Sequence, residues 1–204
     1  CPSTSPKDNP LGRRFREMTG ALRWIEQCTR PDISAVLSEL SKVQINPGQV
    51  HLDQLEHLMR YVNTTQSFSL VCGGPSKDTM DGVLTGSTDS DWAGDADTSY
   101  SRAGYVICMW QTPVSWASQK MKAAAASSCE SEYMAASRAV RESIWLRYLL
   151  SDMGYGDLTT TTYGKFCDRD FVKVRLSALV DPREVLMTFV CDNMGAIALS
   201  ENPV

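Results

Sequence analysis

The hydrophobic positions of this 204-residue chain change their period about a third of the way along it. Between residues 12 and 65 apolar side chains recur at helical spacing, which predicts three helices. Pro31, in Thr29-Arg30-Pro31, suits the first turn of the second helix, which Asn46-Pro47-Gly48 should end; the third should run from about Val50 to Val62. The expected buried faces are, in chain order, Phe15, Met18, Leu22 and Ile25; Ile33, Val36, Leu37 and Leu40; and Leu52, Leu55, Leu58 and Met59.

After Asn63 the apolar residues alternate instead. Residues 67–72 alternate as a strand does, and Gly73-Gly74-Pro75-Ser76 interrupts them, so we place a domain boundary between residues 75 and 76. Ser127 and Glu130 have the spacing of a capping box, which predicts the start of a long helix ending at Gly154. Further strands are expected at 83–88, 104–110, 114–118 and 186–191, a weaker alternation occupies 171–179, and a short helix is expected at 193–200.

This order of elements predicts the fold class. Three β-rich segments, a long helix, another strand and a second helix indicate an α/β fold, with a mixed sheet flanked by helices. A three-helix N-terminal segment at 11–75 precedes it, and the Pro/Ser/Thr-rich residues 1–10 read as a tail or as part of something longer.

Composition narrows the class of protein. A hydrophobic content of 43% is ample for a packed core. No apolar run approaches the roughly 20 residues of a bilayer span, and the N-terminus does not resemble a signal peptide. Seven cysteines are scattered without a CxxC pair, which favours reduced thiols over a zinc site. We therefore expect an intracellular protein, in the cytoplasm or nucleus, with no membrane partner.

Three acids carry the candidate chemistry. Asp89 follows an apolar strand segment, Glu132 lies in the first turn of the long helix, and Asp192 follows the last strand. A fold that gathers them would form a carboxylate cage for divalent metal. The net charge of −4 does not exclude a nucleic-acid partner, because bound cations reverse the local field.

Each acid also has an ordinary explanation. Asp192 could cap a helix, Glu132 could be favoured by the helix dipole, and Asp89 could be a solvated turn residue. Asp91 and Asp95 read as turn acids rather than ligands.

The remaining polar and aromatic residues read as structural. Trp92, Trp116 and Trp145 are assigned to packing, because tryptophans in apolar strands and helices are usually core residues. His51 and His57 do not share a helix face and are expected at the surface. The basic cluster of Arg13, Arg14, Arg16 and Arg23 is usually a solvated face, and a phosphate contact is the alternative.

Seven motifs in fixed order resemble a known family. Together they are similar to the ribonuclease H region, with the preceding polymerase connection segment, of a copia-type LTR retrotransposon polyprotein, over about residues 17 to 204. The motifs are Thr29-Arg30-Pro31-Asp32-Ile33, Asp89-Ser90-Asp91-Trp92-Ala93-Gly94-Asp95, Gly104-Tyr105-Val106, Pro113-Val114-Ser115-Trp116-Ala117-Ser118, Glu130-Ser131-Glu132-Tyr133-Met134-Ala135, Ile144-Trp145-Leu146-Arg147 and Cys191-Asp192-Asn193.

The resemblance implies a function. Residues 11–75 would be the connection segment that follows a reverse transcriptase palm, and 76–204 an RNase H-like domain, truncated at its C-terminus, that hydrolyses the RNA strand of RNA/DNA hybrids. Asp89, Glu132 and Asp192 match the family's first three acids. They would hold two Mg²⁺ (or Mn²⁺) ions, with Asp89 bridging, and the polymerase part of the same polyprotein is an expected partner.

Two alternatives stay open. The family continues past Val204 into a His-containing segment and a helix with a fourth metal-binding Asp, so the chain could instead be a catalytically inactive, truncated module that binds nucleic acid or connects domains. Residues 155–184 form a longer linker than the family pattern implies. A transposase or integrase of the same broad fold is the weaker alternative, because the tryptophan contexts fit the ribonuclease branch better.

Overall fold

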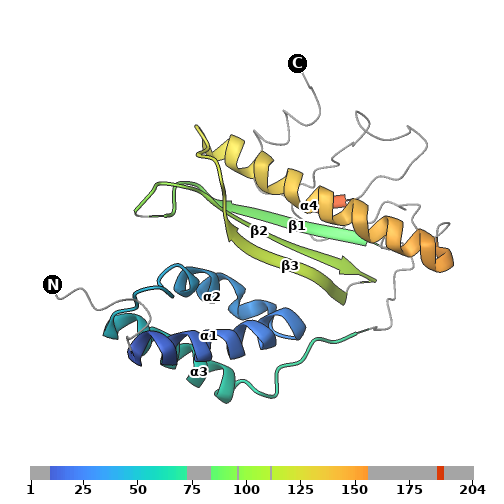
Figure 1. Ribbon diagram of the computed structural model, residues 1–204. Helices are drawn as coiled ribbons and strands as arrows, with labels where there is room; N and C mark the ends of the chain where they lie inside the picture. Colours follow the sequence, from blue (N-terminus) through green and yellow to red (C-terminus); the bar gives the residue numbers. More distant parts are fainter. Residues whose placement is uncertain (1–9, 73–83, 96, 111, 156–187, 191–204) are drawn as a thin grey trace. The chain divides into compact units, whose positions relative to one another are not determined.

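The chain divides into two compact units, Cys1–Leu70 and Val71–Val204 (Figure 1). The computed structural model describes residues 10–72, 84–95, 97–110, 112–155 and 188–190. The chain is mixed α/β, with a helical first unit and a sheet covered by a long helix in the second. The four cysteines in these ranges, Cys28, Cys72, Cys108 and Cys129, are free thiols, as their scattered spacing predicts.

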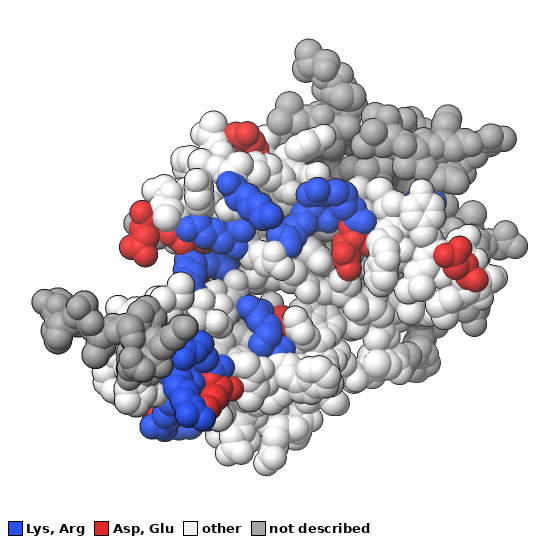
Figure 2. Space-filling view, in the orientation of Figure 1, with Lys and Arg blue, Asp and Glu red and all other residues white. Residues whose placement is uncertain are grey.

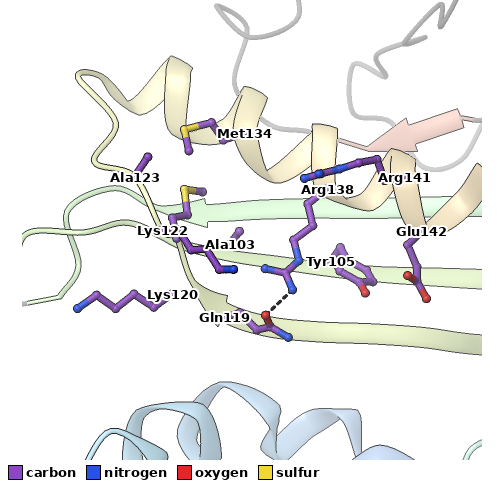
Figure 3. Close-up of a pocket in the computed structure, with 11 residues that line it drawn as sticks. Ala103, Tyr105, Gln119, Lys120, Lys122, Ala123, Met134, Arg138, Arg141 and Glu142 are labelled. Atoms are coloured by element: carbon purple, nitrogen blue, oxygen red, sulfur yellow. Dashed lines mark hydrogen bonds between the residues drawn. The ribbon is translucent and has the colours of Figure 1, made fainter. Parts of the chain in front are cut away.

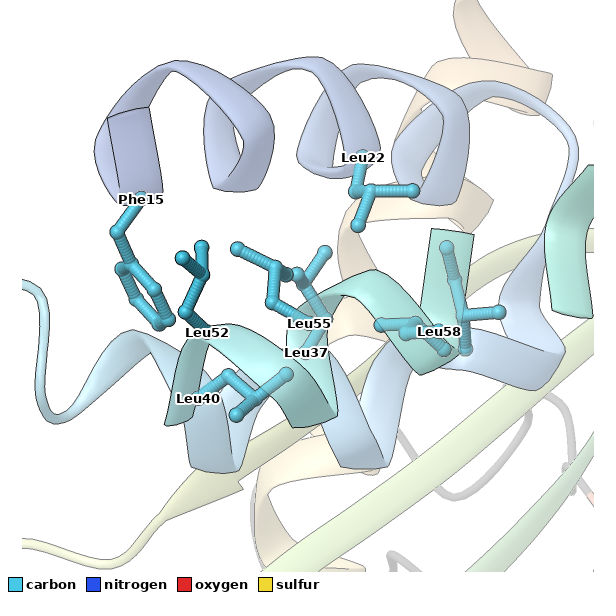
Figure 4. Close-up of a cluster of buried hydrophobic side chains, with 8 residues drawn as sticks. Phe15, Leu22, Leu37, Leu40, Leu52, Leu55 and Leu58 are labelled. Carbon is cyan, nitrogen blue, oxygen red and sulfur yellow. The ribbon is translucent and has the colours of Figure 1, made fainter. Parts of the chain in front are cut away.

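The first unit contains the three predicted helices. They are α1 (Pro10–Cys28), α2 (Ser34–Ser41) and α3 (Gln49–Thr64), with a 3-10 turn, η1 (Pro31–Ile33), in front of α2. Pro31 opens that turn, where the missing N–H of proline costs nothing. One apolar stripe from each helix meets in a single core (Figure 4). Its buried members are Phe15, Leu22, Ile33, Leu37, Leu40, Leu52, Leu55 and Leu58.

Three details of the predicted helical unit are wrong. The second helix ends at Ser41, before Asn46, because turns fill the intervening residues. Val36 and Met59, both expected on buried faces, are 48% and 40% exposed, since other apolar residues already fill the inward stripes of α2 and α3. Residues 67–72 form no strand, because Phe68 packs against the Arg30 guanidinium rather than pairing in a sheet.

Arg30 is the buried polar centre of this unit. Its guanidinium donates two hydrogen bonds to Asp32, at 2.9 and 2.7 Å, and two more to the carbonyl and hydroxyl oxygens of Thr65. Tyr61 donates to Asp32 and places its ring 5.5 Å from the guanidinium. Arg30 therefore ties the α1–α2 junction to the end of α3, which gives the Thr29–Ile33 motif a structural role.

The second unit is built on a four-stranded sheet. Its strands are β1 (Leu84–Asp91), β2 (Arg102–Met109), β3 (Thr112–Lys120) and β4 (Thr188–Val190), in the order β3-β2-β1-β4. β1, β2 and β3 form an antiparallel meander, and β4 pairs with β1 in parallel. A parallel neighbour requires a crossover, and the long helix lies within it. The first three strands were predicted to within three residues at each end.

The long helix α4 (Ser128–Leu150) packs on β1 and β2 through Ala139, Val140 and Leu150, which meet Leu84 and Ile107 of the sheet. Its N-terminus has the predicted cap: Ser127 Oγ accepts from the Glu130 amide, and the Glu130 carboxylate accepts from the Ala126 amide. One π-turn, η2 (Ser151–Tyr155), follows, and Gly154 at φ 87° ends it. Glycine adopts this left-handed conformation without steric cost.

Several predicted features lie outside the described residues. These are the 171–179 alternation, the helix at 193–200 and Asp192. Within the part of the chain that is described, no helix is both long and apolar enough to cross a membrane.

Candidate functional site

Asp89 lies near the C-terminal end of β1, directly opposite Gly104 of β2. The residues of β1 alternate in burial, with Leu84, Gly86 and Thr88 buried and Asp89 exposed. Because successive side chains of a strand point to opposite faces, Asp89 lies on the face away from α4. Its carboxylate is thus available to solvent at a strand end.

Glu132 approaches the same strand end from α4. The side chain is 5% exposed, and its Oε1 accepts a hydrogen bond from the backbone amide of Ser90 at 3.1 Å. Glu132 occupies the fifth residue of α4, so the cap at Ser127 sets the point at which the carboxylate meets the strand. That Glu132 shares a metal site with the other two acids stays a prediction.

Asp89 and Glu132 are both associated with the same end of β1, Asp89 on the face away from α4 and Glu132 through the Ser90 amide. The backbone N–H groups of a strand point within the plane of the sheet. The Glu132 oxygen that accepts from the Ser90 amide therefore also lies close to this plane. Asp89 precedes Ser90 directly and projects from the same end of β1. The described part of β4 pairs only with Thr85, Gly86 and Ser87, which leaves the Ser90 amide for Glu132.

Buried hydroxyl groups belong to residues that adjoin the acids in the sequence. Thr88 Oγ1, Ser90 Oγ and Ser131 Oγ are buried and, within the described residues, have no hydrogen-bond partner. Each belongs to a residue next to Asp89 or Glu132 in the sequence. Buried polar atoms in native proteins usually bind a protein group or an ordered water. The strand end is therefore a polar region with hydrogen-bonding capacity to spare.

Asp192, the third predicted acid, lies outside the described residues. The register of β1 and β4 pairs Thr85 with Thr188 and Ser87 with Val190, and Asp89 and Asp192 have the same separation in sequence as these pairs. Among the described residues, no three acidic, histidine or cysteine side chains gather as a metal site would require. The complete three-acid site stays a prediction.

Asp95 is a buried anchor of the loop between β1 and β2. It is 6% exposed and accepts two hydrogen bonds from Thr98, one from the amide and one from the hydroxyl. Lys120, at the end of β3, lies 3.2 Å from its other oxygen. The sequence analysis rightly placed Asp95 in a turn but missed this ion pair, because a partner 25 residues away leaves no local signal.

Trp92 links the acidic strand end to the loop before α4. Its indole N–H donates to the Ala125 carbonyl at 3.1 Å, while the side chain is 50% exposed. Trp145 is likewise 56% exposed on α4. The assignment of these two tryptophans to the core is therefore wrong: Trp92 lies in the turn after β1, and Trp145 lies on an exposed side of α4.

The basic and histidine residues of the first unit are engaged locally. Arg13 pairs with Glu17, Arg14 with Glu56 and Arg23 with Glu26, which favours the structural reading of this cluster. His51 Nδ1 accepts from the Gly48 amide and so caps α3.

Similar proteins come from plant transposons. The chain is 34% identical over 169 residues to a retrovirus-related Pol polyprotein from transposon TNT 1-94 of Nicotiana tabacum, an alignment that covers 82% of this chain and 12% of that one. It is 30% identical over 190 residues to the Pol polyprotein from transposon RE1 of Arabidopsis thaliana, covering 93% of this chain and 11% of that one. The chain thus spans about an eighth of these relatives.

A shorter relative comes from another source. A protein named secreted RxLR effector protein 161, from Plasmopara viticola, is 37% identical over 134 residues, which is 65% of this chain and 90% of that one. No family model and no solved structure matches the chain. From its motifs and its plant relatives together, the chain belongs to the retrovirus-related Pol polyproteins of transposons, as a region of a copia-type Pol polyprotein.

Proposed function

We propose that residues 76–204 form an RNase H-like domain that hydrolyses the RNA strand of RNA/DNA hybrids within a retrotransposon Pol polyprotein. The observation that carries the proposal is the hydrogen bond from the Ser90 amide to Glu132, which brings a helix carboxylate to the strand end that bears Asp89. Two acids from distant segments are thereby associated with one end of one strand, Asp89 on the face away from α4 and Glu132 from α4 itself.

The topology supports the same assignment. The RNase H-like assignment includes a mixed sheet flanked by helices, and the three antiparallel strands, the long helix and the parallel fourth strand agree with it. In this arrangement the C-terminal ends of β1 and β4 lie at the same edge. Asp192 would be the third acid of the site, because it has the same sequence separation from Asp89 as the paired residues of β1 and β4 have from one another.

The available ligands suit Mg²⁺ or Mn²⁺. Both ions are hard and prefer carboxylate oxygens, with water completing the coordination. Asp89, Glu132 and Asp192 would hold them, and bound water would complete the coordination. When bound, two divalent cations supply an activated water and neutralise the leaving 3′ oxygen.

The roles of the protein groups follow from their positions. Exposed Asp89 would face the substrate, whereas buried Glu132 is fixed by the Ser90 amide and would hold its oxygen in one place. Such preorganisation is what a metal site needs to select one geometry. We further propose that the domain acts beside the polymerase part of the same polyprotein, inside the cell.

Cleavage of a labelled hybrid tests the proposal. Purified chain should cut the RNA strand in Mg²⁺ or Mn²⁺ but not in EDTA, and Asp89→Asn should lower the rate at least 100-fold, since one ligand is lost. Asp97→Asn is the matched control, because Asp97 is an exposed acid in the following loop. Equal cleavage by wild type and Asp89→Asn would refute the assignment of Asp89.

The same assay covers the second candidate. If wild type binds the hybrid without cutting it in either metal, the chain is a nucleic-acid-binding module that keeps the fold without the activity. Products of DNA strand transfer with labelled DNA ends would instead indicate a transposase-type activity.

A further inference from the structure

A basic groove runs between α4 and the β2–β3 side of the sheet in the second unit (Figure 3). It has a volume of about 630 Å³ and is open to solvent. Arg138 reaches from α4 across the groove to the side-chain oxygen of Gln119 on β3, while Tyr105 and Glu142 lie together at one end. Its lining contains four basic residues, Lys120, Lys122, Arg138 and Arg141, and one acid, Glu142.

The basic residues of the groove differ in how far their charge is neutralised. Lys120 pairs with buried Asp95 and lies 5.0 Å from the Tyr100 ring, so it is committed to the β1–β2 loop. Lys122 and Arg141 have no ion pair within the described residues, and both are exposed. Figure 2 shows that basic side chains gather on this face over the sheet and α4. The groove therefore has an excess of positive charge on side chains that a ligand can reach.

The single acid does not cancel this excess. Glu142 accepts a hydrogen bond from Ser115 Oγ at 3.0 Å and lies at the Tyr105 end. Burial is the main cause that raises the pKa of Tyr105 from its ordinary value, so this phenol stays neutral at physiological pH. Arg138 and Arg141 are three residues apart and thus share one side of α4.

We propose that this groove binds the phosphodiester backbone of a nucleic acid, through Lys122, Arg138 and Arg141. Guanidinium groups bind phosphate oxygens through two parallel hydrogen bonds, and a lysine adds a flexible point charge. An acidic polypeptide is the competing ligand class. The proposed function favours the nucleic acid, and the excess of basic over acidic side chains in the lining suits its phosphates. Binding of an acidic peptide is an outcome of the test.

This inference rests on the proposed function for its ligand class, and it names a binding surface that shares no residue with the acids. Asp89 and Glu132 act at the end of β1, whereas the groove residues belong to β2, β3, the following loop and the middle of α4. Binding to the groove needs no divalent metal. Backbone binding and cleavage can therefore be measured separately.

The test is hybrid binding in EDTA, measured by fluorescence anisotropy on the full chain with a labelled 18-base-pair RNA/DNA duplex. Lys122→Ala/Arg141→Ala should weaken binding at least tenfold at low salt. The slope of log K against log salt should fall by about two, because each lost phosphate contact removes about one released counterion. The control is Lys42→Ala/Arg60→Ala, which makes the same charge change in the helical unit.

The outcomes are separable. Equal weakening by the groove and control variants would overturn the proposal, as would no weakening by either. A labelled poly-glutamate peptide serves as the second probe. If the groove variant lost binding to this peptide but bound the hybrid as wild type does, the proposal would be overturned in favour of a polypeptide ligand. Far-ultraviolet circular dichroism confirms folding, and single variants Lys122→Gln and Arg141→Gln provide milder changes. Groove-dependent binding without cleavage would refute only the nuclease assignment.

Discussion

Glu132 of α4 and Ser90 of β1 are joined by a hydrogen bond from the strand amide to the helix carboxylate, 42 residues apart in sequence. The bond has two consequences. It gives a hydrogen-bond partner to the Ser90 amide, which lies past the β1 residues that pair with the described part of β4. It also fixes the position of a buried carboxylate at the strand end that bears Asp89. Different substitutions of Glu132 should therefore change the stability of the fold and the affinity for metal to different extents.

The first prediction concerns Glu132. Glu132→Gln keeps an oxygen that can accept from the Ser90 amide, so the free energy of unfolding should change by less than about 1 kcal/mol. Glu132→Ala leaves a buried amide unsatisfied and should cost about 1–3 kcal/mol. Urea unfolding measures both. In Mn²⁺ calorimetry both variants should bind more weakly than wild type, and equal stability of the two would contradict the role of the bond.

The second prediction concerns Trp92. Trp92→Phe removes the hydrogen bond to Ala125 but keeps an aromatic ring, so the loop before α4 should open more often. Amide hydrogen exchange at Glu130 and Ser131 should accelerate, because their amides bond to Ser127 in the first turn. The global stability should fall by only about 0.5–1.5 kcal/mol.

Trp145→Phe is the matched control for Trp92→Phe. Trp145 has a similar exposure and lies on the same helix whose first turn is monitored. Unchanged exchange in Trp92→Phe, or an equal acceleration in the control, would show that the indole bond does not hold the loop.

The periodicity of apolar residues predicted the elements well because local spacing decides which face is buried. Phe15, Leu37 and Leu55 are fully buried on helices that the pattern placed correctly. The pattern failed at Phe68, which alternates like a strand residue but packs on Arg30. A strand needs a neighbouring strand to pair with. The spacing of the residues near Phe68 does not show whether such a strand exists.

The candidate site was predictable to a similar degree. Whether Asp89 and Glu132 share a metal site stays a prediction, but their positions at a strand end and at a helix start followed from local signals. The roles of Arg30 and Asp95 did not. Arg30 bonds to Thr65, 35 residues away, and Asp95 pairs with Lys120, so each depends on a tertiary contact that no local window contains.

The third prediction tests the corrected face of α3 with two adjacent residues. Leu58 is 5% exposed and belongs to the core, whereas Met59 is 40% exposed. Leu58→Ala should therefore destabilise the helical unit by about 2–5 kcal/mol. Met59→Ala should change its stability by less than about 1 kcal/mol. Similar losses in urea unfolding would mean that Met59 is packed after all.

The fourth prediction follows from Arg30 and Asp32. Hydrogen bonds from the Arg30 guanidinium are the main cause that lowers the pKa of Asp32 below its ordinary value of 3.8. A lowered folded-state pKa contributes stability that is present above pH 3.8 and is lost as the pH falls through the folded-state value. Asp32→Asn should thus destabilise the helical unit at pH 7, and this difference should shrink below about pH 3.8.

The size of this effect follows from the exposure of the pair. Arg30 is 6% exposed and Asp32 35% in their side chains, so solvent screens the aspartate in part. We expect a loss of about 1–2 kcal/mol at pH 7, measured by urea unfolding at pH 7, 5, 3 and 2. Asp53→Asn, at an exposed acid bonded to Gln49, should change stability by less than about 0.5 kcal/mol at pH 7. If the deficit of Asp32→Asn stayed constant down to pH 2, the ion pair with Arg30 would not be its source, and the loss would come from the changed hydrogen bond of Tyr61 instead.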